Sequence, residues 1–279
     1  MSIDNLTGHD LNLNNLLTLY KNNKLPSKIL LSGKKGIGKS LIVFEFLLKV
    51  FNKENSNLLI KNNTHSNVLN IKKKNDKKFI EIDQIREIIK FINQSSFNNK
   101  SRFVIIDDVE FLNVNSSNAL LKSLEEPNNN VYFFLIYDSD NKILDTIKSR
   151  CLEIKIKLNK EDVKLIVNNY FNDKIYEKLN ESLVNFYSTP KFIISLVIYL
   201  EQNNLALSDM NINKLIKNII DNKHYNKHTF TEEYLNYIIE LFFYNHINIT
   251  KKFSYKLKKY YFSKLSNIKK FNLDYETFF

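Results

Sequence analysis

Gly33-Lys34-Lys35-Gly36-Ile37-Gly38-Lys39-Ser40 is the stretch that decides the fold of this chain. It matches the pattern G-x-x-x-x-G-K-[ST], in which glycines let the backbone bring its N–H groups close to phosphate oxygens. The apolar run 28–32 precedes it and a helical pattern over 41–51 follows, so the order is strand, loop, helix. Three of the chain's four glycines fall in this stretch. The sequence therefore predicts a phosphate-binding loop (P-loop).

The P-loop implies a nucleotide and its metal ion. Lys39 would place a point charge on the terminal phosphate oxygens, and Ser40 would give its hydroxyl to Mg²⁺. The N–H groups of the loop and the N-terminus of the following helix would add positive potential. The residues expected to hold ATP here are Gly33, Lys34, Gly36, Ile37, Gly38, Lys39, Ser40 and Leu41.

Composition limits the classes of protein that remain. A chain of 279 residues can form two or three domains. No apolar run is long enough for a membrane span and the first residues lack a signal pattern, so we expect a cytoplasmic protein. The single cysteine excludes an intrachain disulfide and a cysteine-rich zinc module. The net charge of +11 permits a nucleic-acid partner, but the excess of Asn, Ile and Lys is typical of an A+T-rich coding sequence.

The alternation of strand and helix patterns in the first part predicts an α/β domain with a parallel sheet. The expected strands are Ile29–Ser32, Asn67–Ile71, Arg102–Asp107, Val131–Ile136 and Leu152–Ile156. The expected helices of this part are Leu11–Asn22, Lys39–Phe51, Ile82–Ser95 and Ser116–Glu125, the last capped by Asn115 or Ser116 and ended by Pro127.

Beyond about residue 159 the pattern is helical throughout. The expected helices are Lys160–Tyr170, Asp173–Tyr187, Lys191–Glu201, Ile212–Asn222, Thr231–Phe243 and Thr250–Leu265. A break near 203–209 suggests a second boundary. The predicted domains are 1–158, an α/β nucleotide domain, 159–205, a small helical domain, and 206–279, a C-terminal helical domain.

A second motif supports the P-loop. The buried-strand pattern 102–106 ends in the paired acids Asp107 and Asp108, as in the Walker B element of P-loop proteins. Asp107 would then hold Mg²⁺ opposite Ser40. Many ATPases place a glutamate at the next position to orient the attacking water, whereas this chain has the shorter Asp108. Glu110 could substitute only if the turn bends it inward. The sequence thus favours nucleotide binding over hydrolysis.

Two longer motifs resemble a known family. Asn118-Ala-Leu-Leu-Lys-Ser-Leu-Glu-Glu-Pro127 and Asp145-Thr-Ile-Lys-Ser-Arg-Cys151 follow the Walker B strand at the spacing of clamp-loader subunits of the AAA+ class. The resemblance covers about residues 5–200. It implies an AAA+ P-loop domain, a small helical lid and a C-terminal helical collar domain that joins subunits into a ring.

Within that family the chain resembles the delta-prime group more than the motor (gamma/tau) group of the bacterial DNA polymerase III clamp loader. The segments Thr64-His-Ser-Asn-Val68 and Ile80-Glu-Ile-Asp-Gln-Ile-Arg86 resemble the delta-prime pattern, from which Ser66 and Asn67 depart. The opening segment Leu6-Thr-Gly8-His9 also resembles it. The motor's Asp-Glu is replaced by Asp107-Asp108, and its sensor 1 threonine by Tyr137-Asp138. The zinc-binding cysteines of many members are absent, so ATP and Mg²⁺ are expected without zinc.

The resemblance also implies roles and partners. Arg150 of the Ser-Arg-Cys motif would act in trans, as an arginine finger on ATP held by a neighbouring subunit. Lys191 would touch the nucleotide as a sensor 2 cation. The partners would be the motor (gamma/tau) and delta subunits in a hetero-pentameric ring on primer–template DNA, with Ser116, Asn118 and Lys122 near the DNA backbone. The subunit would support ATP-dependent loading of the sliding clamp.

Other interpretations stay open at this stage. Arg150 can instead be a surface arginine at a helix end, and Lys191 a solvated lysine at a helix start. The three residues at 116–122 can serve as core or capping groups. As a whole, the chain can be a gamma-type motor that hydrolyses ATP itself. A small-molecule phosphotransferase is disfavoured, because the helical part after residue 159 has no arginine for a lid.

Overall fold

The computed structural model describes residues 6–51, 53–74, 76–94, 100–125, 130–226, 229–246 and 251–271. The chain forms two compact units, Met1–Asn159 and Lys160–Phe279. Their boundary falls where the sequence pattern changes from mixed to purely helical. The further division of the helical part near residue 205 stays a prediction. Among the described residues, no helix has both the length and the apolar character that a membrane crossing requires.

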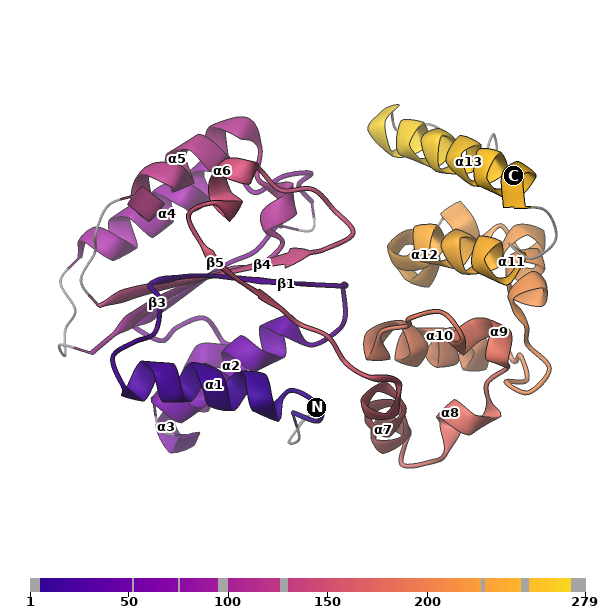
Figure 1. Ribbon diagram of the computed structural model, residues 1–279, viewed down its shortest axis with the longest axis horizontal. Coiled ribbons are helices and arrows are strands. Elements are labelled where there is room, and N and C mark those ends of the chain that lie inside the picture. The colour runs from indigo at the N-terminus through magenta and orange to yellow at the C-terminus, as the bar shows by residue number, and fades with distance from the viewer. Residues whose placement is uncertain are drawn as a thin grey trace. The chain divides into compact units, whose positions relative to one another are not determined.

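The first unit is built on a five-stranded sheet in the order β2-β3-β4-β1-β5, with every pairing parallel (Figure 1). Its strands are β1 (Lys28–Gly33), β2 (Val68–Ile71), β3 (Arg102–Ile106), β4 (Val131–Asp138) and β5 (Leu152–Lys155). All five predicted strands are therefore confirmed. β4 runs two residues further than expected, and its last residue, Asp138, is paired in register with Gly33 at the start of the P-loop.

Helices cover both faces of this sheet, as Figure 1 shows. One face carries α1 (Asp10–Lys21), α2 (Lys39–Val50) and α3 (Lys53–Lys61), and the other carries α4 (Ile82–Asn93), α5 (Val114–Glu125) and α6 (Asp145–Lys148). Phe46 of α2 packs on Phe103 and Phe134 of the sheet, with ring centroids 5.7 and 5.3 Å away. Each fully buried large apolar side chain contributes roughly 1.5–3 kcal/mol. Burial on both faces explains why the central strands β1, β3 and β4 have nearly continuous apolar sequences.

Three details of the first unit differ from the predictions. α5 begins at Val114, because Asn113, rather than Asn115 or Ser116, accepts a hydrogen bond from the N–H of Ser116 at 2.8 Å. α3 was not predicted, since its Lys- and Asn-rich sequence carries few apolar residues. The short η1 (Val109–Phe111) and α6 were also missed. Pro127, expected to end α5, lies outside the described residues.

The second unit contains only helices in its described part. They are α7 (Lys160–Phe171), α8 (Ile175–Lys178), α9 (Glu181–Val184), α10 (Pro190–Gln202), α11 (Ile212–Asp221), η2 (His224–Asn226), α12 (Thr229–His246) and α13 (Lys251–Phe271). The single helix expected over 173–187 is wrong. Leu179 has extended backbone, and Asn180 caps a new helix by accepting from the N–H of Ser182 at 3.0 Å. Asparagine competes for backbone groups in this way and favours caps over helix interiors.

Gly33 is needed for close contact between backbone segments at the end of β1. A Cβ added there would lie 2.6 Å from the carbonyl oxygen of Ile156, a backbone atom that cannot move aside cheaply. We expect Gly33→Ala to lower the free energy of unfolding by about 1–3 kcal/mol, the usual range for overpacking. Urea unfolding would measure it. Lys35→Ala, at an exposed site in the same loop, should change stability by no more than about 0.5 kcal/mol. Equal stability of the two variants would contradict this reading of Gly33.

Candidate nucleotide-binding site

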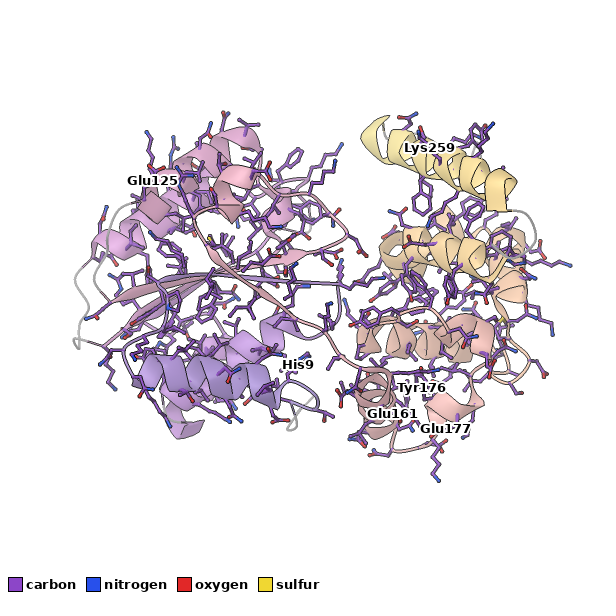
Figure 2. All side chains as sticks on the ribbon, viewed as in Figure 1. His9, Glu125, Glu161, Tyr176, Glu177 and Lys259 are labelled. Carbon is purple, nitrogen blue, oxygen red and sulfur yellow. The ribbon has the colours of Figure 1, made fainter. Side chains whose placement is uncertain are left out.

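The P-loop joins β1 to α2 and has the backbone shape that its glycines permit. Gly36 and Gly38 have φ of 80° and 108°, which side chains other than glycine rarely adopt. A Cβ at Gly38 would lie 2.9 Å from Nε2 of His9. This His9 nitrogen lies 2.7 Å from the carbonyl oxygen of Ile37, and the residue is 2% exposed. His9 therefore supports the loop from beneath, at the N-terminus of α1 (Figure 2).

Lys39 lies inside this loop. Its ammonium group donates hydrogen bonds to the carbonyl oxygens of Gly33, at 2.6 Å, and Lys34, at 2.9 Å. Burial lowers the pKa of Lys39, while nearby carboxylates, Asp138 above all, oppose that effect. A buried cation beside a set of backbone N–H groups is suited to an anionic ligand.

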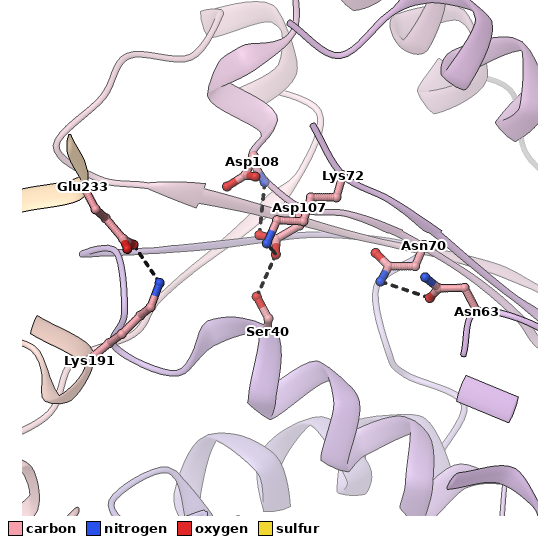
Figure 3. A network of polar contacts seen from close by, with 8 residues as sticks. All are labelled: Ser40, Asn63, Asn70, Lys72, Asp107, Asp108, Lys191 and Glu233. Carbon is pink, nitrogen blue, oxygen red and sulfur yellow. Dashed lines mark hydrogen bonds and ion pairs between the residues drawn. The ribbon is translucent and has the colours of Figure 1, made fainter. Parts of the chain in front are cut away.

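The two expected Mg²⁺ ligands lie together. Ser40 Oγ donates a hydrogen bond to Asp107 Oδ2 at 3.0 Å, and the N–H of Asp108 donates to Asp107 Oδ1, also at 3.0 Å (Figure 3). The ammonium nitrogen Nζ of Lys72 lies 3.6 Å from Asp107 Oδ2. Mg²⁺ prefers oxygen ligands and usually completes its shell with water and phosphate, so one hydroxyl and one carboxylate at this edge fit the ion.

Two further carboxyl groups, of Asp108 and Glu110, have unusual surroundings. Asp108 has left-handed backbone, with φ of 61°, and burial and then Asp107 raise its pKa. Burial raises the pKa of Glu110 to about 7. Glu110 Oε2 accepts a hydrogen bond from the N–H of Asp138 at 3.3 Å. The turn thus bends Glu110 inward, the condition that the sequence left open, and directs it to the end of β4.

Glu110 makes the stability of the chain depend on pH. Because its pKa is about 7 in the folded chain and its ordinary value is 4.5, the folded state binds more protons between these values. The free energy of unfolding should therefore fall as pH rises through this window. Glu110→Gln keeps an acceptor for the Asp138 N–H and removes the titration, so it should be the more stable form at pH about 8.

Urea unfolding near pH 5 and pH 8 measures this effect. The wild type should lose more stability between the two conditions than Glu110→Gln does. Asp108, whose pKa is also raised, contributes a pH dependence of the same sign to both proteins. Glu87→Gln, at an exposed position of α4, should behave as the wild type. Parallel pH profiles for Glu110→Gln and the wild type would show that Glu110 does not titrate in this window.

The structure separates the two residues that replace the sensor 1 threonine. Tyr137 is buried, and its hydroxyl donates to Glu153 Oε1 at 3.3 Å. Asp138 faces the P-loop, and its Oδ1 accepts a hydrogen bond from the N–H of Lys35 at 3.2 Å. A carboxylate, and not a hydroxyl, therefore faces the P-loop from the end of β4.

Arg150 follows α6 and is exposed. Its Nε and Nη2 donate to Glu125 Oε1 at 2.9 and 2.5 Å, and its Nη1 donates to the carbonyl oxygen of Thr146 at 3.0 Å. Glu125 ends α5 (Figure 2). The Glu-Glu-Pro and Ser-Arg-Cys motifs thus meet through this ion pair, which holds the guanidinium at the surface.

Other predicted residues lie elsewhere. Lys191, in the helical unit, forms an ion pair with Glu233 at 2.6 Å (Figure 3). Ser116 is fully buried and donates to the carbonyl oxygen of Ile80 at 2.9 Å, so it is a core residue. Asn118 and Lys122 are exposed one turn apart on α5.

Sequence reasoning missed the contacts of His9, Lys72 and Asp138 with the motifs. His9 had one signal, its place in the Leu6-Thr-Gly8-His9 segment that resembles the family's opening. Asp138 had another, since polar residues at the carboxyl ends of parallel strands gather at one edge of the sheet. Nothing in the sequence indicated that Lys72 would pair with Asp107.

The parallel sheet, the P-loop and the Ser40–Asp107 pair define a P-loop fold of the AAA+ class. The family model described as DNA polymerase III, delta subunit matches residues 8–160, more than half of the chain. The chain therefore belongs to this family of clamp-loader subunits.

Two sequence relatives have names that agree with that assignment. The DNA polymerase III subunit delta' of Pseudomonas aeruginosa is 37% identical over 90 residues, which cover 32% of this chain and 27% of the relative. The subunit gamma of Buchnera aphidicola subsp. Schizaphis graminum is 35% identical over 149 residues, which cover 50% of this chain and 41% of the relative. A solved gamma subunit-related protein from Thermotoga maritima matches with a TM-score of 0.48 and 22% identity. The match covers 88% of this chain and 75% of the Thermotoga chain.

The matched stretches span less than half the length of the first two relatives. Both delta' and gamma subunits are among the proteins that this chain resembles.

Proposed function

We propose that this chain is a delta-prime-type subunit of the DNA polymerase III clamp loader, which holds a magnesium nucleotide without hydrolysing it efficiently and presents Arg150 to a neighbour's ATP. The observation that carries the proposal is the composition of the phosphate site. The Ser40–Asp107 pair and the buried Lys39 suit a magnesium nucleotide. The groups that would direct a water molecule at it are replaced by Asp108 and Asp138.

The identity of residue 108 is one reason to expect slow hydrolysis at this site. Its side chain is one methylene shorter than glutamate, which moves the carboxylate back by roughly 1–1.5 Å. A misplacement of about that size can reduce a rate about 10²-fold. Asp108 stays the candidate catalytic residue of its own site, in a weak form of the role that the family's glutamate fills.

Arg150 supports the role in trans. A guanidinium is planar and offers paired donors. The Arg150 guanidinium can therefore donate to phosphate oxygens in place of the Glu125 carboxylate, with the same hydrogen-bond geometry. Its exposed position on the AAA+ unit leaves it accessible to a second subunit. The proposed neighbours are the gamma/tau motor and the delta subunit, in a pentameric ring of cytoplasmic replication proteins.

The helical unit would supply the other functions of such a ring. We assign residues 159–205 to the lid and 206–279 to the collar, with Lys191 as the sensor 2 cation. In the isolated chain Glu233 neutralises this lysine, so a nucleotide would have to exchange with that carboxylate. Asn118 and Lys122, exposed on α5, would face the DNA backbone, a contact sensitive to salt and independent of sequence.

A gamma-type motor is the second candidate. Two observations favour it. A gamma subunit matches over 149 residues at 35% identity, close to the 37% identity of the first delta' relative. Glu110, with its pKa raised to about 7, has the proton affinity of a general base near neutral pH.

Co-purification tests the proposed place in a complex. The full chain is mixed with the gamma and delta subunits of the same organism, and the assembly is weighed by native mass spectrometry. We expect one copy of this chain in each assembly. A monomer in every mixture would contradict membership of the ring, whereas several copies that replace gamma would favour the motor.

A further inference from the structure

Asp138 lies at the point where β4 meets the P-loop. Its Oδ1 accepts hydrogen bonds from the N–H of Lys35 at 3.2 Å and the N–H of Asp140 at 3.1 Å. Its Oδ2 accepts from Asn141 Nδ2 at 3.2 Å. The backbone N–H of Asp138 itself donates to Glu110 Oε2. These four bonds hold both the residue and its carboxylate group in one orientation.

The carboxylate of Asp138 accepts a hydrogen bond from an N–H group of the P-loop that could otherwise bind phosphate. Lys35 belongs to the P-loop, whose N–H groups serve phosphate oxygens in proteins of this class. Burial lowers the pKa of Lys39, and of the carboxylates that oppose this shift Asp138 comes first. Lys39 is the side chain that reaches the terminal phosphates of a bound nucleotide. The negative charge of Asp138 therefore lies at the terminal-phosphate end of the site.

We propose that Asp138 makes this P-loop selective for a nucleoside diphosphate over the triphosphate, because its carboxylate already takes the loop N–H that a terminal phosphate would use. The inference rests on the proposed binding of a magnesium nucleotide. A triphosphate brings further negative charge against a fixed carboxylate, and like charges in a partly buried site repel strongly. A diphosphate ends before that point and keeps the contacts of the inner phosphates.

Calorimetric titration of the full chain with ADP and with ATP, each with Mg²⁺ at pH about 8, tests the proposal. The wild type should bind ADP at least about tenfold more tightly than ATP. Asp138→Asn keeps a side-chain oxygen for the Lys35 N–H and removes the charge, so the two affinities should become equal within about threefold. A tenfold change corresponds to about 1.4 kcal/mol.

Two controls keep the result specific. Glu87→Gln removes one negative charge from an exposed site on α4 and should keep the wild-type preference. Asp138→Ser, which also removes the charge, should lose the preference as Asp138→Asn does and replaces that variant if it does not fold.

Each outcome decides a separate claim. Equal affinities of the wild type for ADP and ATP would overturn the inference and leave nucleotide binding intact. A preference for ADP that persists in both Asp138 variants would overturn the assignment to Asp138. Failure of the wild type to bind either nucleotide would overturn the proposed nucleotide site together with the inference.

Discussion

Lys39→Ala is expected to weaken binding of a magnesium nucleotide to the isolated chain by about 10–100-fold. The reason is geometric and electrostatic. Lys39 Nζ already lies within the loop, 2.6 Å from the carbonyl oxygen of Gly33, and its side chain is buried. Hydrogen bonds from a charged group contribute about 1.5–3 kcal/mol, and this one would reach a phosphate oxygen.

The measurement is calorimetric titration with ADP and Mg²⁺, and circular dichroism confirms that the variant folds. Lys49→Ala is the matched control, since it removes one lysine from an exposed position of the same helix, α2. It should bind as the wild type does. Loss of affinity in both variants would point to a general charge effect, and no loss in Lys39→Ala would show that the nucleotide does not use the P-loop.

Arg150→Ala is expected to suppress hydrolysis at the neighbouring subunit that faces this residue by roughly 10³-fold or more, which is the usual effect of removing an arginine finger. Total DNA-stimulated hydrolysis by a reconstituted assembly should fall by the share that this one site contributes. The assembly itself should stay intact. The guanidinium is at the surface, and the Glu125 and Thr146 contacts that hold it there are all within this chain.

Two further variants separate this role from a structural one. Arg150→Lys retains the charge without the paired donors, so it should also fail to restore hydrolysis. Glu125→Gln weakens the ion pair and leaves the finger in place, so it should retain most of the activity. Unchanged hydrolysis with Arg150→Ala would contradict the trans role, and loss of assembly would mean that Arg150 serves the interface alone.

The sequence predicted best what depends on short stretches. The central strands β1, β3 and β4 were found because they are apolar runs buried on both faces. The edge strands β2 and β5 are less buried and were found from shorter apolar patterns. The P-loop was found because a glycine loop needs its residues at fixed spacing. The Ser40–Asp107 contact followed from the two motifs together. Helix boundaries inside a long helical pattern were harder to predict. Asn180 caps a new helix within residues 173–187, whose sequence pattern predicts a single helix.

Contacts between distant residues were the least predictable. Asp138 meets Lys35 across 103 positions, and that contact depends on the register of β4 against β1 and on the length of β4. Arg150 meets Glu125 only because α5 and α6 lie side by side. Neither contact can be predicted from the sequence around its residues, although each residue lies in or beside a motif.

The central claim is that this chain holds a nucleotide without acting as a motor, and phosphate release by the isolated chain tests it most directly. The chain is incubated with ATP and Mg²⁺, and steady-state release is compared with that of Lys39→Ala. We expect the wild type to bind nucleotide and to release phosphate only at the background level of Lys39→Ala. Sustained turnover that Lys39→Ala abolishes would contradict the account and make the chain a motor subunit.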